Sequence, residues 1–515
     1  MEIDAAVETP VRTIETECCI IGAGPAGLAV AATLCAAGHD VVLLESGSAN
    51  GSSSGSDVFE QELNEGSCVG SPYAGLRLTR HRGVGGTTLL WNTPSAGSPG
   101  AKYVPLDACD LHGRWEEAPD GWPFTMKQLA PWLRRAELAA GIASFADQPS
   151  PGGPHTRLTD RFRDGDVAPR AYHLGSRAAL INPLHLQIAT ASNARLFTHA
   201  TVVDFAQRGG AATIRVATDG RPEWSVRAKI VVLAAGAVEN ARLLLVSANR
   251  NGWGGDQSAW LGRGFMEHPR DRSITLRPGD ASHYAALDFL DSREIAGHSG
   301  TTTVLGRLGL VERAVVRGNL LNASATLLPI VQATRERVRE VMVRRTGYQG
   351  LRRLLPSGGH GWSRHPAPER VFDGFTVLLN VEQPPRRENA ITLSTAVDRH
   401  GVPRPELRWH WHQDDQIRLQ RVRDVFAAAL RGADVGNVLI DPSITPDPNA
   451  HHHAGTTRMH DDARHGVVNG DGRVHGTTSV FVVGASTFPT AGYANPTLTI
   501  LAMALRLADH LHATS

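Results

Sequence analysis

The segment that most restricts the fold of this chain is IIGAGPAGLAVAATL, residues 20–34. A short apolar run leads into three glycines, Gly22, Gly24 and Gly27, at GxGxxG spacing, and an alanine-rich stretch follows. This order predicts a buried strand, a tight turn and a helix. The next apolar run, DVVLLE (40–45), completes a βαβ unit.

The three glycines and the end of the second strand together predict a dinucleotide site. The first glycine permits the tight turn, the second lets the backbone approach a pyrophosphate, and the third lets the helix pack on the strand. Glu45 ends the second strand, where a carboxylate can accept hydrogen bonds from both hydroxyls of an adenosine ribose. A turn so near the start of the chain favours FAD over NAD. The alternative is glycine-rich helix packing without a ligand.

The same order of strand, glycine turn and helix returns twice. It is found in RAKIVVLAAGAVENARLLLVSA (227–248) and in the tail, where a strand at 479–483 precedes a closing amphipathic helix. Blocks so far apart that share one architecture predict an α/β fold. We expect a Rossmann-like FAD-binding domain assembled from discontinuous segments, namely 10–110, 190–275 and 445–515.

The remaining segments, 111–189 and 276–444, are expected to form a substrate-binding domain, which makes the whole chain α+β. Three β-leaning runs within 371–412, FTVLLNV, AITLST and ELRWHWH, predict a mostly antiparallel sheet there. Residues 334–355, inside a possible insert at 330–370, form a basic helical stretch with apolar residues on one face. A solvated cationic face over a packed stripe is its ordinary interpretation; a lid or partner surface is the alternative.

Composition limits the possible partners. The 52 basic and 51 acidic residues leave a net charge of +1, so neither nucleic acid nor an anionic membrane is expected as the main partner. The five cysteines lack a CxxC or metal spacing, which favours a reducing, cytoplasmic compartment over a disulfide framework. The acidic start lacks the pattern of a signal peptide, and no run approaches the ~18 apolar residues of a membrane helix. We expect a soluble protein that acts on a small molecule.

A second glycine-dense turn, RHRGVGGTTLLWN, occupies residues 80–92. Consecutive glycines and hydroxyls expose backbone amides that can line an isoalloxazine ring and a pyrophosphate. On its own the pattern also fits an ordinary tight loop.

Two segments near the C-terminus carry candidate catalytic groups: HHHAGTTRM (451–459) and PTAGYANPTLT (489–499). Oxidation of an alcohol by hydride transfer needs a base for the hydroxyl proton, a polar group that holds the oxygen, and a flavin N5 near the carbon. A neutral histidine and an asparagine can supply the first two. Adjacent histidines without a spaced Cys, Asp or Glu set do not match a structural zinc pattern, so no metal site is predicted.

Taken together, these segments resemble the glucose-methanol-choline (GMC) oxidoreductases, and more closely their pyranose 2-oxidase-like, sugar-oxidising branch. The resemblance rests on the first turn with Glu45, the second turn, and the later segments GAVENARLLL, LGRGFMEHP, HxxGTTRM and NPTLT. These cover about half of the chain. The expected substrate domain matches only loosely, through VEQPPRRENAITLS (381–394).

The resemblance implies that His452, the first position of HxxGT, is the catalytic base and that Asn495 is its partner, where other members carry a second histidine. Gln383 and His268 are weaker candidates for substrate contact. The positions implied to bind the cofactor are Gly22, Gly24, Pro25, Ala26, Gly27, Glu45, Ser46, Arg82, Gly85, Gly86, Thr87, Thr88, Trp91, Asn92, Val202, Ala235, Gly236, Gly484, Ala485, Asn495, Pro496 and Thr497.

The chain departs from family patterns at two positions. Many sugar-oxidising relatives attach FAD through a histidine just before the tryptophan of the second turn, whereas this chain has Leu90 there. We therefore predict non-covalent FAD. Gly484 stands where many members carry aspartate, which agrees with the pyranose 2-oxidase-like branch.

The predicted function is FAD-dependent oxidation of a sugar or glycoside hydroxyl to a carbonyl, with hydride transfer to flavin N5 and dioxygen or a quinone-type carrier as electron acceptor. Three alternatives stay open at this point. They are an alcohol oxidoreductase of aminoglycoside or other antibiotic biosynthesis in the same family, a lyase on the same scaffold, and a flavin-binding protein without redox turnover.

Overall fold

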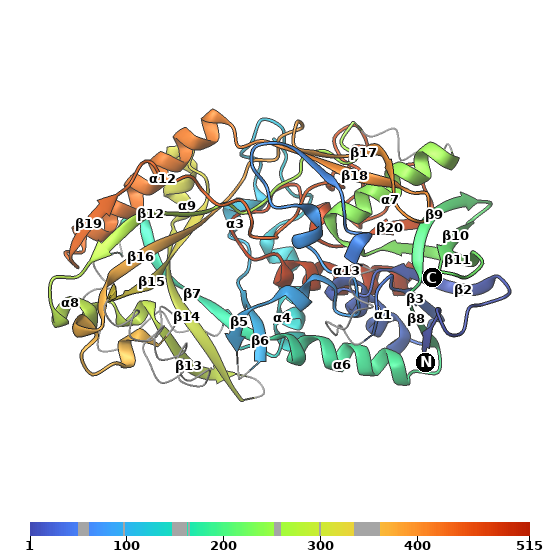
Figure 1. The fold of residues 1–515 in the computed structure, drawn as a ribbon, viewed down its shortest axis with the longest axis horizontal. Coiled ribbons are helices and arrows are strands. Elements are labelled where there is room, and N and C mark those ends of the chain that lie inside the picture. The colour runs from blue at the N-terminus through green and yellow to red at the C-terminus, as the bar shows by residue number, and fades with distance from the viewer. Residues whose placement is uncertain are drawn as a thin grey trace.

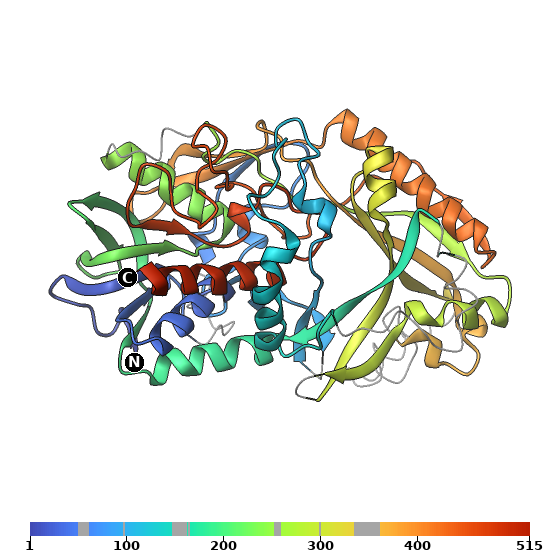
Figure 2. The ribbon, with the colours of Figure 1, turned by 180° about the vertical axis from the view of Figure 1, so that it is seen from behind.

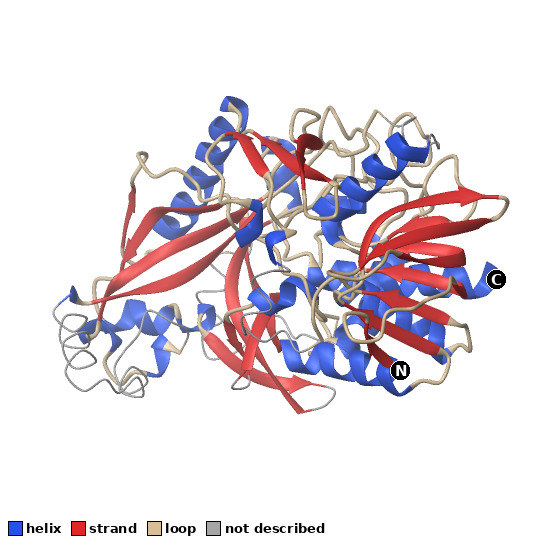
Figure 3. Cartoon of the chain, turned by 45° about the vertical axis from the view of Figure 1, so that its right-hand side comes forward, coloured by secondary structure: helices blue, strands red, loops and turns tan. Residues whose placement is uncertain are grey.

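The computed structural model describes residues 1–49, 61–95, 98–146, 162, 165–251, 259–297, 300–333 and 361–514. Its strands gather into two main groups at opposite ends of the long axis, as Figures 1 and 3 show. Both chain termini lie in the first group. The basic segment 334–355 and most of the possible insert at 330–370 lie outside the described residues, as does most of the Gly/Ser-rich loop that follows Glu45.

Within the described chain, the first group is an eight-stranded sheet. Six of its strands run parallel, in the order β1 (Glu2–Asp4), β8 (Ala194–Thr198), β3 (Val41–Leu44), β2 (Ile14–Ile21), β11 (Trp224–Leu233) and β20 (Val480–Val482). Two antiparallel strands extend it from β11: β10 (Ala211–Ala217) and β9 (Thr201–Arg208). All of β3 and most of β2 are buried, as expected for parallel strands covered on both faces.

Helices cover this sheet as the βαβ pattern predicts. Helix α1 (Pro25–Ala36) packs on α13 (Thr497–Thr514) and α6 (Arg177–Thr190), and α13 also contacts α4 (Met126–Ala139). Figure 2 shows α13 and α6 lying side by side with α1 on one face of the sheet. Helix α7 (Gly236–Asn251) follows β11 and contacts β9. The predicted Rossmann-like unit, built from three distant blocks, is confirmed.

The second group is a nine-stranded antiparallel sheet in the described part of the chain. Its strands, in order, are β19 (Asn437–Ile440), β12 (Arg270–Arg277), β16 (Phe372–Val381), β15 (Ala323–Val331), β14 (Gly300–Leu310), β7 (Val167–Ser176), β6 (Ser98–Tyr103) and β5 (Thr93–Ser95), with β13 (Ser292–Gly297) paired to β14. Helix α12 (Gln413–Gly432) packs against β19 and β12. Shorter helices complete the described structure: α3 (Ala108–Leu111), α8 (Ala281–Ala286), α9 (Glu312–Gly318), η1 (Leu76–Leu78), η2 (Gly86–Leu90), η4 (Asp288–Leu290), η5 (Trp362–Arg364), η6 (Pro368–Arg370) and η7 (Ala485–Thr487).

The strand prediction for 371–412 needs one correction. The run FTVLLNV lies in β16 of the large sheet, but the other two runs form β17 (Ala390–Val397) and β18 (Pro403–Trp409) of a separate sheet. That sheet is completed by β4 (Ser67–Gly70), parallel to β18. Apolar side chains of β17 and β18 are buried against α7, so packing on the first domain holds these strands apart from β16.

Segments also cross between the two expected domains. Strands β5 and β6 fall within 10–110 but pair in the second sheet, and α6 falls within 111–189 but packs on α1. These segments do not follow the expected division of the chain. The residue limits of the two domains stay a prediction. All five cysteines are free thiols, and among the described residues no helix combines the length and apolar character needed to span a bilayer.

Candidate active site

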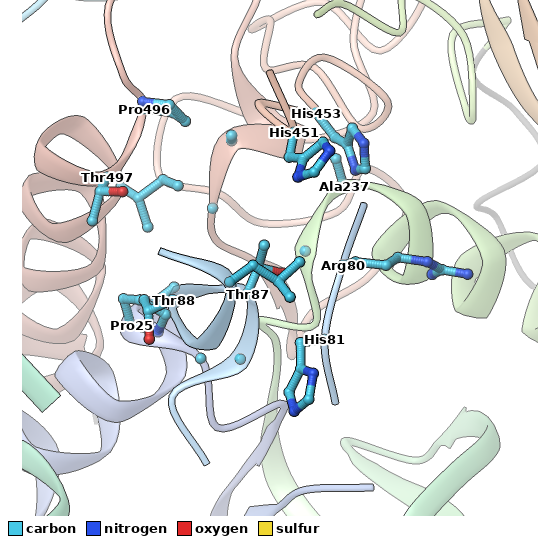
Figure 4. Close-up of a pocket in the computed structure, with 18 of the residues that line it drawn as sticks. Pro25, Arg80, His81, Thr87, Thr88, Ala237, His451, His453, Pro496 and Thr497 are labelled. Atoms are coloured by element: carbon cyan, nitrogen blue, oxygen red, sulfur yellow. The ribbon is translucent and has the colours of Figure 1, made fainter. Parts of the chain in front are cut away.

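A cavity of about 680 Å³ lies where the two main sheets face each other. The carboxyl ends of β2, β3 and β11 line one end of it, and β6 and β16 of the second sheet contribute to the other. The residues just after β20 and the start of α13 also line it. This is the edge at which parallel α/β sheets bind ligands. Figure 4 shows Pro25, Thr87, His451 and Thr497, from four distant segments, around this space.

Three helix N-termini, those of α1, α7 and α13, open onto the cavity. Their unpaired backbone N–H groups and helix dipoles favour an anion such as a pyrophosphate. At Gly24, Gly236 and Gly484, which all line the cavity, an added Cβ would find no atom within 4 Å. The absence of side chains at these points leaves a cradle that a flat, extended cofactor can occupy.

Gly27 and Gly22 have a different surrounding, although they belong to the same motif. A Cβ on Gly27 would lie 1.9 Å from the Gly22 carbonyl oxygen, and Gly22 has a φ of 102°. Gly27 itself does not line the cavity. Gly27 therefore lets the helix pack closely on the turn, and this packing brings the N-terminus of α1 to the cavity.

Glu45 lies at the end of β3 and faces the same cavity. Its carboxylate accepts backbone hydrogen bonds from Ala23 at 2.9 Å, Gly47 at 2.8 Å and Gly83 at 3.0 Å. Burial raises the pKa of Glu45, and these N–H donors act against that rise. A carboxylate has about four acceptor positions, so it retains capacity for a ribose hydroxyl.

The second glycine turn forms one wall of the cavity. Gly86, Thr87, Thr88, Leu90, Trp91 and Asn92 all line it, and so does Val202 from β9. Gly85 does not, because its N–H donates to the Ala23 carbonyl at 2.8 Å and joins the two turns. Arg82 lines the cavity while donating to Ser46 Oγ at 2.9 Å and Asn64 Oδ1 at 3.0 Å, which fixes the turn.

His452 and Asn495 meet on another wall of the cavity. Asn495 Nδ2 donates to His452 Nε2 at 3.0 Å, and Nδ1 of His452 lies 3.1 Å from Nδ1 of His268. Because Nε2 accepts the amide hydrogen, the proton of a neutral His452 is on Nδ1 and is donated to His268. Burial and the neighbouring cationic and imidazole groups place the pKa of His452 well below its usual value. The ring is therefore neutral at physiological pH.

A buried carboxylate, Glu267, holds the histidine loop. One oxygen accepts the backbone N–H of His452 at 3.0 Å and of His268 at 3.1 Å. The other accepts the Tyr73 hydroxyl at 2.7 Å and lies 3.3 Å from His453 Nε2. Burial raises the pKa of Glu267 to about 7, with the hydrogen bonds acting against the rise.

The three adjacent histidines thus have three different surroundings. His453 is buried beside Tyr73, with its Nε2 2.8 Å from the Tyr73 hydroxyl, and His452 carries the Asn495 contact. His451 has a φ of 63°, in the left-handed region, and precedes the other two; all three histidines line the cavity. Within the described chain no group of three or more His, Cys, Asp or Glu side chains could hold a metal ion.

The structure places the two weaker substrate candidates behind the cavity wall. Gln383 Oε1 accepts hydrogen bonds from the Glu267 N–H at 2.9 Å and Trp409 Nε1 at 3.1 Å, and the side chain is fully buried. His268 is buried beneath His452. Neither residue lines the cavity, because each is committed to supporting the histidine loop. Gln383 and His268 thus support the histidine loop in this structure, and a substrate contact by either residue stays a prediction.

Sequence reasoning missed other groups at this end of the cavity. Glu267, in the LGRGFMEHP segment, lies behind the cavity wall, and a carboxylate next to apolar residues is the signal that could have found it. Lys102 and Arg270 line the cavity, and nothing in their local sequence marks them.

Comparisons with known proteins agree with this geometry. Residues 385–504 match the family described as GMC oxidoreductase, and residues 17–251 match the one described as FAD dependent oxidoreductase. Paromamine 6'-oxidase of Streptomyces fradiae is 25% identical and covers 95% of this chain and 90% of its own. 2-Methyl-1,2-propanediol dehydrogenase of Mycolicibacterium austroafricanum is 26% identical, covering 96% and 95%.

The fold is similar to that of solved flavoproteins. A variant of formate oxidase from Aspergillus oryzae superposes with a TM-score of 0.58 at 17% identity, covering 98% of this chain and 99% of its own. The cavity has the anion-binding helix ends, the open glycine positions and the Glu45 carboxylate that FAD requires. The chain therefore carries an FAD-dependent oxidoreductase domain and a glucose-methanol-choline (GMC) oxidoreductase domain, and it is similar to oxidases and dehydrogenases that act on alcohol groups.

Proposed function

We propose that this enzyme oxidises a hydroxyl of a sugar or glycoside to a carbonyl, with His452 as the base. The observation that carries the proposal is the 3.0 Å contact between Asn495 and His452 on the wall of the cavity that cradles FAD. The similarity to paromamine 6'-oxidase and the sugar-oxidase pattern of the sequence support the substrate class.

The proton of the substrate hydroxyl passes to Nε2 of His452. That atom carries the lone pair of the ring, which accepts the Asn495 amide hydrogen, since the other ring nitrogen holds its hydrogen toward His268. Asn495 cannot accept a proton, but its amide can turn from the ring to the substrate oxygen and hold it in place. When bound, FAD supplies the two-electron acceptor for the hydride that leaves the carbinol carbon.

We further propose that the cofactor-binding positions implied by the resemblance contact FAD, with Gly27 and Gly85 acting through packing. Attachment is proposed to be non-covalent, because Leu90 stands at the position of the attaching histidine and lines the cavity without a nucleophile. Dioxygen or a quinone-type carrier is proposed to reoxidise the flavin. The five free thiols suit a reducing compartment, which supports a cytoplasmic location.

Anaerobic flavin reduction by a panel of monosaccharides, glycosides and aminoglycosides tests the proposal. His452→Ala should slow reduction by at least ~10²-fold, the usual effect of removing a general base. His465→Ala, at an exposed histidine outside the cavity, should leave the rate unchanged and is the matched control. Wild-type rates in His452→Ala would refute the assignment. Mixing the reduced enzyme with oxygen or with a quinone then identifies the acceptor.

A second substrate class, an aminoglycoside, is favoured by one observation, the similarity to paromamine 6'-oxidase along nearly the whole chain. The same panel separates the two classes. Faster flavin reduction by aminoglycosides than by neutral sugars would assign the enzyme to the second class.

A further inference from the structure

Lys102 places an ammonium group in the cavity without a partner. The residue lies on β6, is partly buried and lines the cavity. Its Nζ has no hydrogen bond or ion pair with any described residue, and it lies over the Tyr172 ring, 5.5 Å from the ring centroid. The chain has three lysines, and the other two, Lys127 and Lys229, are exposed.

A second cation, Arg270, lies on the same wall. Its Nη2 donates to Asp447 at 2.5 Å and to the Asn449 carbonyl at 2.6 Å, while its Nε has no hydrogen-bond partner among the described residues. Arg270 is paired across the strands with Asn380, whose amide donates to the Tyr172 hydroxyl at 3.1 Å. A continuous row of contacts therefore joins Arg270 to the ring over which Lys102 lies.

Arg270 lies near both Lys102 and the proposed base. Arg270 contributes to lowering the pKa of both Lys102 and His452, so it is close enough to act on each. Burial is the larger cause for Lys102, whose pKa falls to about 8. Burial thus acts against the charged form of Lys102, and no carboxylate in the described part of the chain offsets it.

Two carboxylates line the described part of the cavity. Among the described lining residues they are Glu45, at the end of β3, and Glu239, which pairs with Arg80 and Arg82. Asp447 does not line the cavity, but it forms an ion pair with Arg270 and so neutralises the charge of that cation. Glu267, behind the cavity wall, also acts on Arg270. Lys102 is therefore a cation of this lining that no described carboxylate pairs with.

We propose that the cavity binds a substrate with an anionic substituent, a carboxylate or a phosphate, which Lys102 and Arg270 hold while the hydroxyl faces His452. This inference rests on the proposed function and narrows its substrate class. It favours a sugar acid or a sugar phosphate over a neutral sugar. It disfavours an aminoglycoside, since a cationic amine would meet Lys102 without a carboxylate in between.

The test compares matched sugars on the holoenzyme by anaerobic stopped-flow measurement of flavin reduction. Glucuronate and glucose 6-phosphate give the two anionic arms, and glucose and glucosamine give the neutral and cationic arms. At least one anionic sugar should show a Kd at least about tenfold below that of glucose, the effect of a charge-assisted hydrogen bond, and glucosamine should bind most weakly. The arm with the lower Kd tells whether the anion is a carboxylate or a phosphate.

Three variants locate the effect. Lys102→Met should remove the preference for the anion, Lys102→Arg should retain most of it, and Lys229→Met, at an exposed lysine, should leave it unchanged. Equal Kd values for charged and neutral sugars in the wild type would overturn the proposal. So would an anion preference that survives in Lys102→Met.

Ligand binding without turnover separates this inference from the proposed function. Acetate and inorganic phosphate are titrated into the oxidised holoenzyme, and the change in flavin absorbance is followed. Saturable binding of either anion that is lost in Lys102→Met supports the anion site even if no sugar reduces the flavin. Absence of Lys102-dependent binding of both anions overturns the site, even if neutral sugars are oxidised.

Discussion

The backbone N–H of His452 donates to the carboxylate of Glu267 at 3.0 Å, so a fully buried acid fixes the loop that carries the proposed base. The same carboxylate accepts from the His268 backbone and from the Tyr73 hydroxyl. The position of the base therefore depends on a residue that does not line the cavity.

Replacing Glu267 by alanine should destabilise the protein and slow flavin reduction. Three buried donors would lose their acceptor, and each unpaired group costs about 1–3 kcal/mol. Glu267→Gln keeps one acceptor oxygen and should recover part of both losses. Thermal unfolding and the anaerobic reduction rate measure the two effects at matched FAD content. An alanine variant with wild-type Tm and rate would contradict the supporting role.

Stability should depend on pH through Glu267. Its pKa is raised from 4.5 to about 7 in the folded state, so the folded protein binds the proton more tightly than the unfolded chain does. This contribution to stability is fully present below about 4.5 and is lost as the pH rises to about 7. The free energy of unfolding of the wild type, relative to Glu267→Gln, should therefore fall across that window. Parallel pH profiles of the two proteins would rule this out.

Asn495→Ala should slow flavin reduction by ~10-fold or more, since an oriented hydrogen-bond donor to the reacting oxygen is lost. FAD content should change little, because the side chain is bonded to His452 and the remaining cavity contacts are kept. Asn495→His places an imidazole N–H donor at this position and should retain a larger part of the flavin reduction rate than Asn495→Ala does. Equal rates in the alanine variant and the wild type would exclude Asn495 from the reaction.

Two glycines of one motif should respond differently to alanine. Gly27→Ala drives a Cβ to 1.9 Å from the Gly22 carbonyl and should lower Tm strongly, with little folded holoenzyme recovered. Gly24 has an ordinary φ of −72° and open space around it, so Gly24→Ala should fold normally but bind FAD more weakly. Apoprotein Tm and FAD titration separate the two cases. Equal loss of Tm in both variants would argue against the cradle at Gly24.

Acid denaturation should release the flavin. With Leu90 in place of an attaching histidine, the lining of the cavity offers no bond to the ring at that position. After precipitation with trichloroacetic acid, yellow FAD is expected in the supernatant. A coloured, fluorescent pellet would show covalent attachment and contradict the prediction.

Much of the first domain follows from the sequence because its signals are local. The first glycine turn, the strand before it and Glu45 lie close together in the sequence. Their roles depend on a residue spacing that the backbone geometry fixes. Strand β1 escaped prediction, since three residues carry too little periodicity and their pairing with β8 depends on a segment far along the chain. The sequence also failed to predict that β17 and β18 form a sheet separate from that of β16, because this arrangement too depends on contacts with distant segments.

By itself, the sequence indicated the FAD-binding fold, the two catalytic candidates and the resemblance to the glucose-methanol-choline oxidoreductases, because motifs at fixed spacing encode backbone geometry. Tertiary structure decided what surrounds those groups. Glu267 holds the histidine loop from beneath, and Lys102 and Arg270 enter the same cavity from other strands, so their roles exist only after folding brings these segments together. Burial raises the free-energy cost of a carboxylate or an ammonium group that has no partner. A local sequence pattern does not indicate which distant residue will supply that partner.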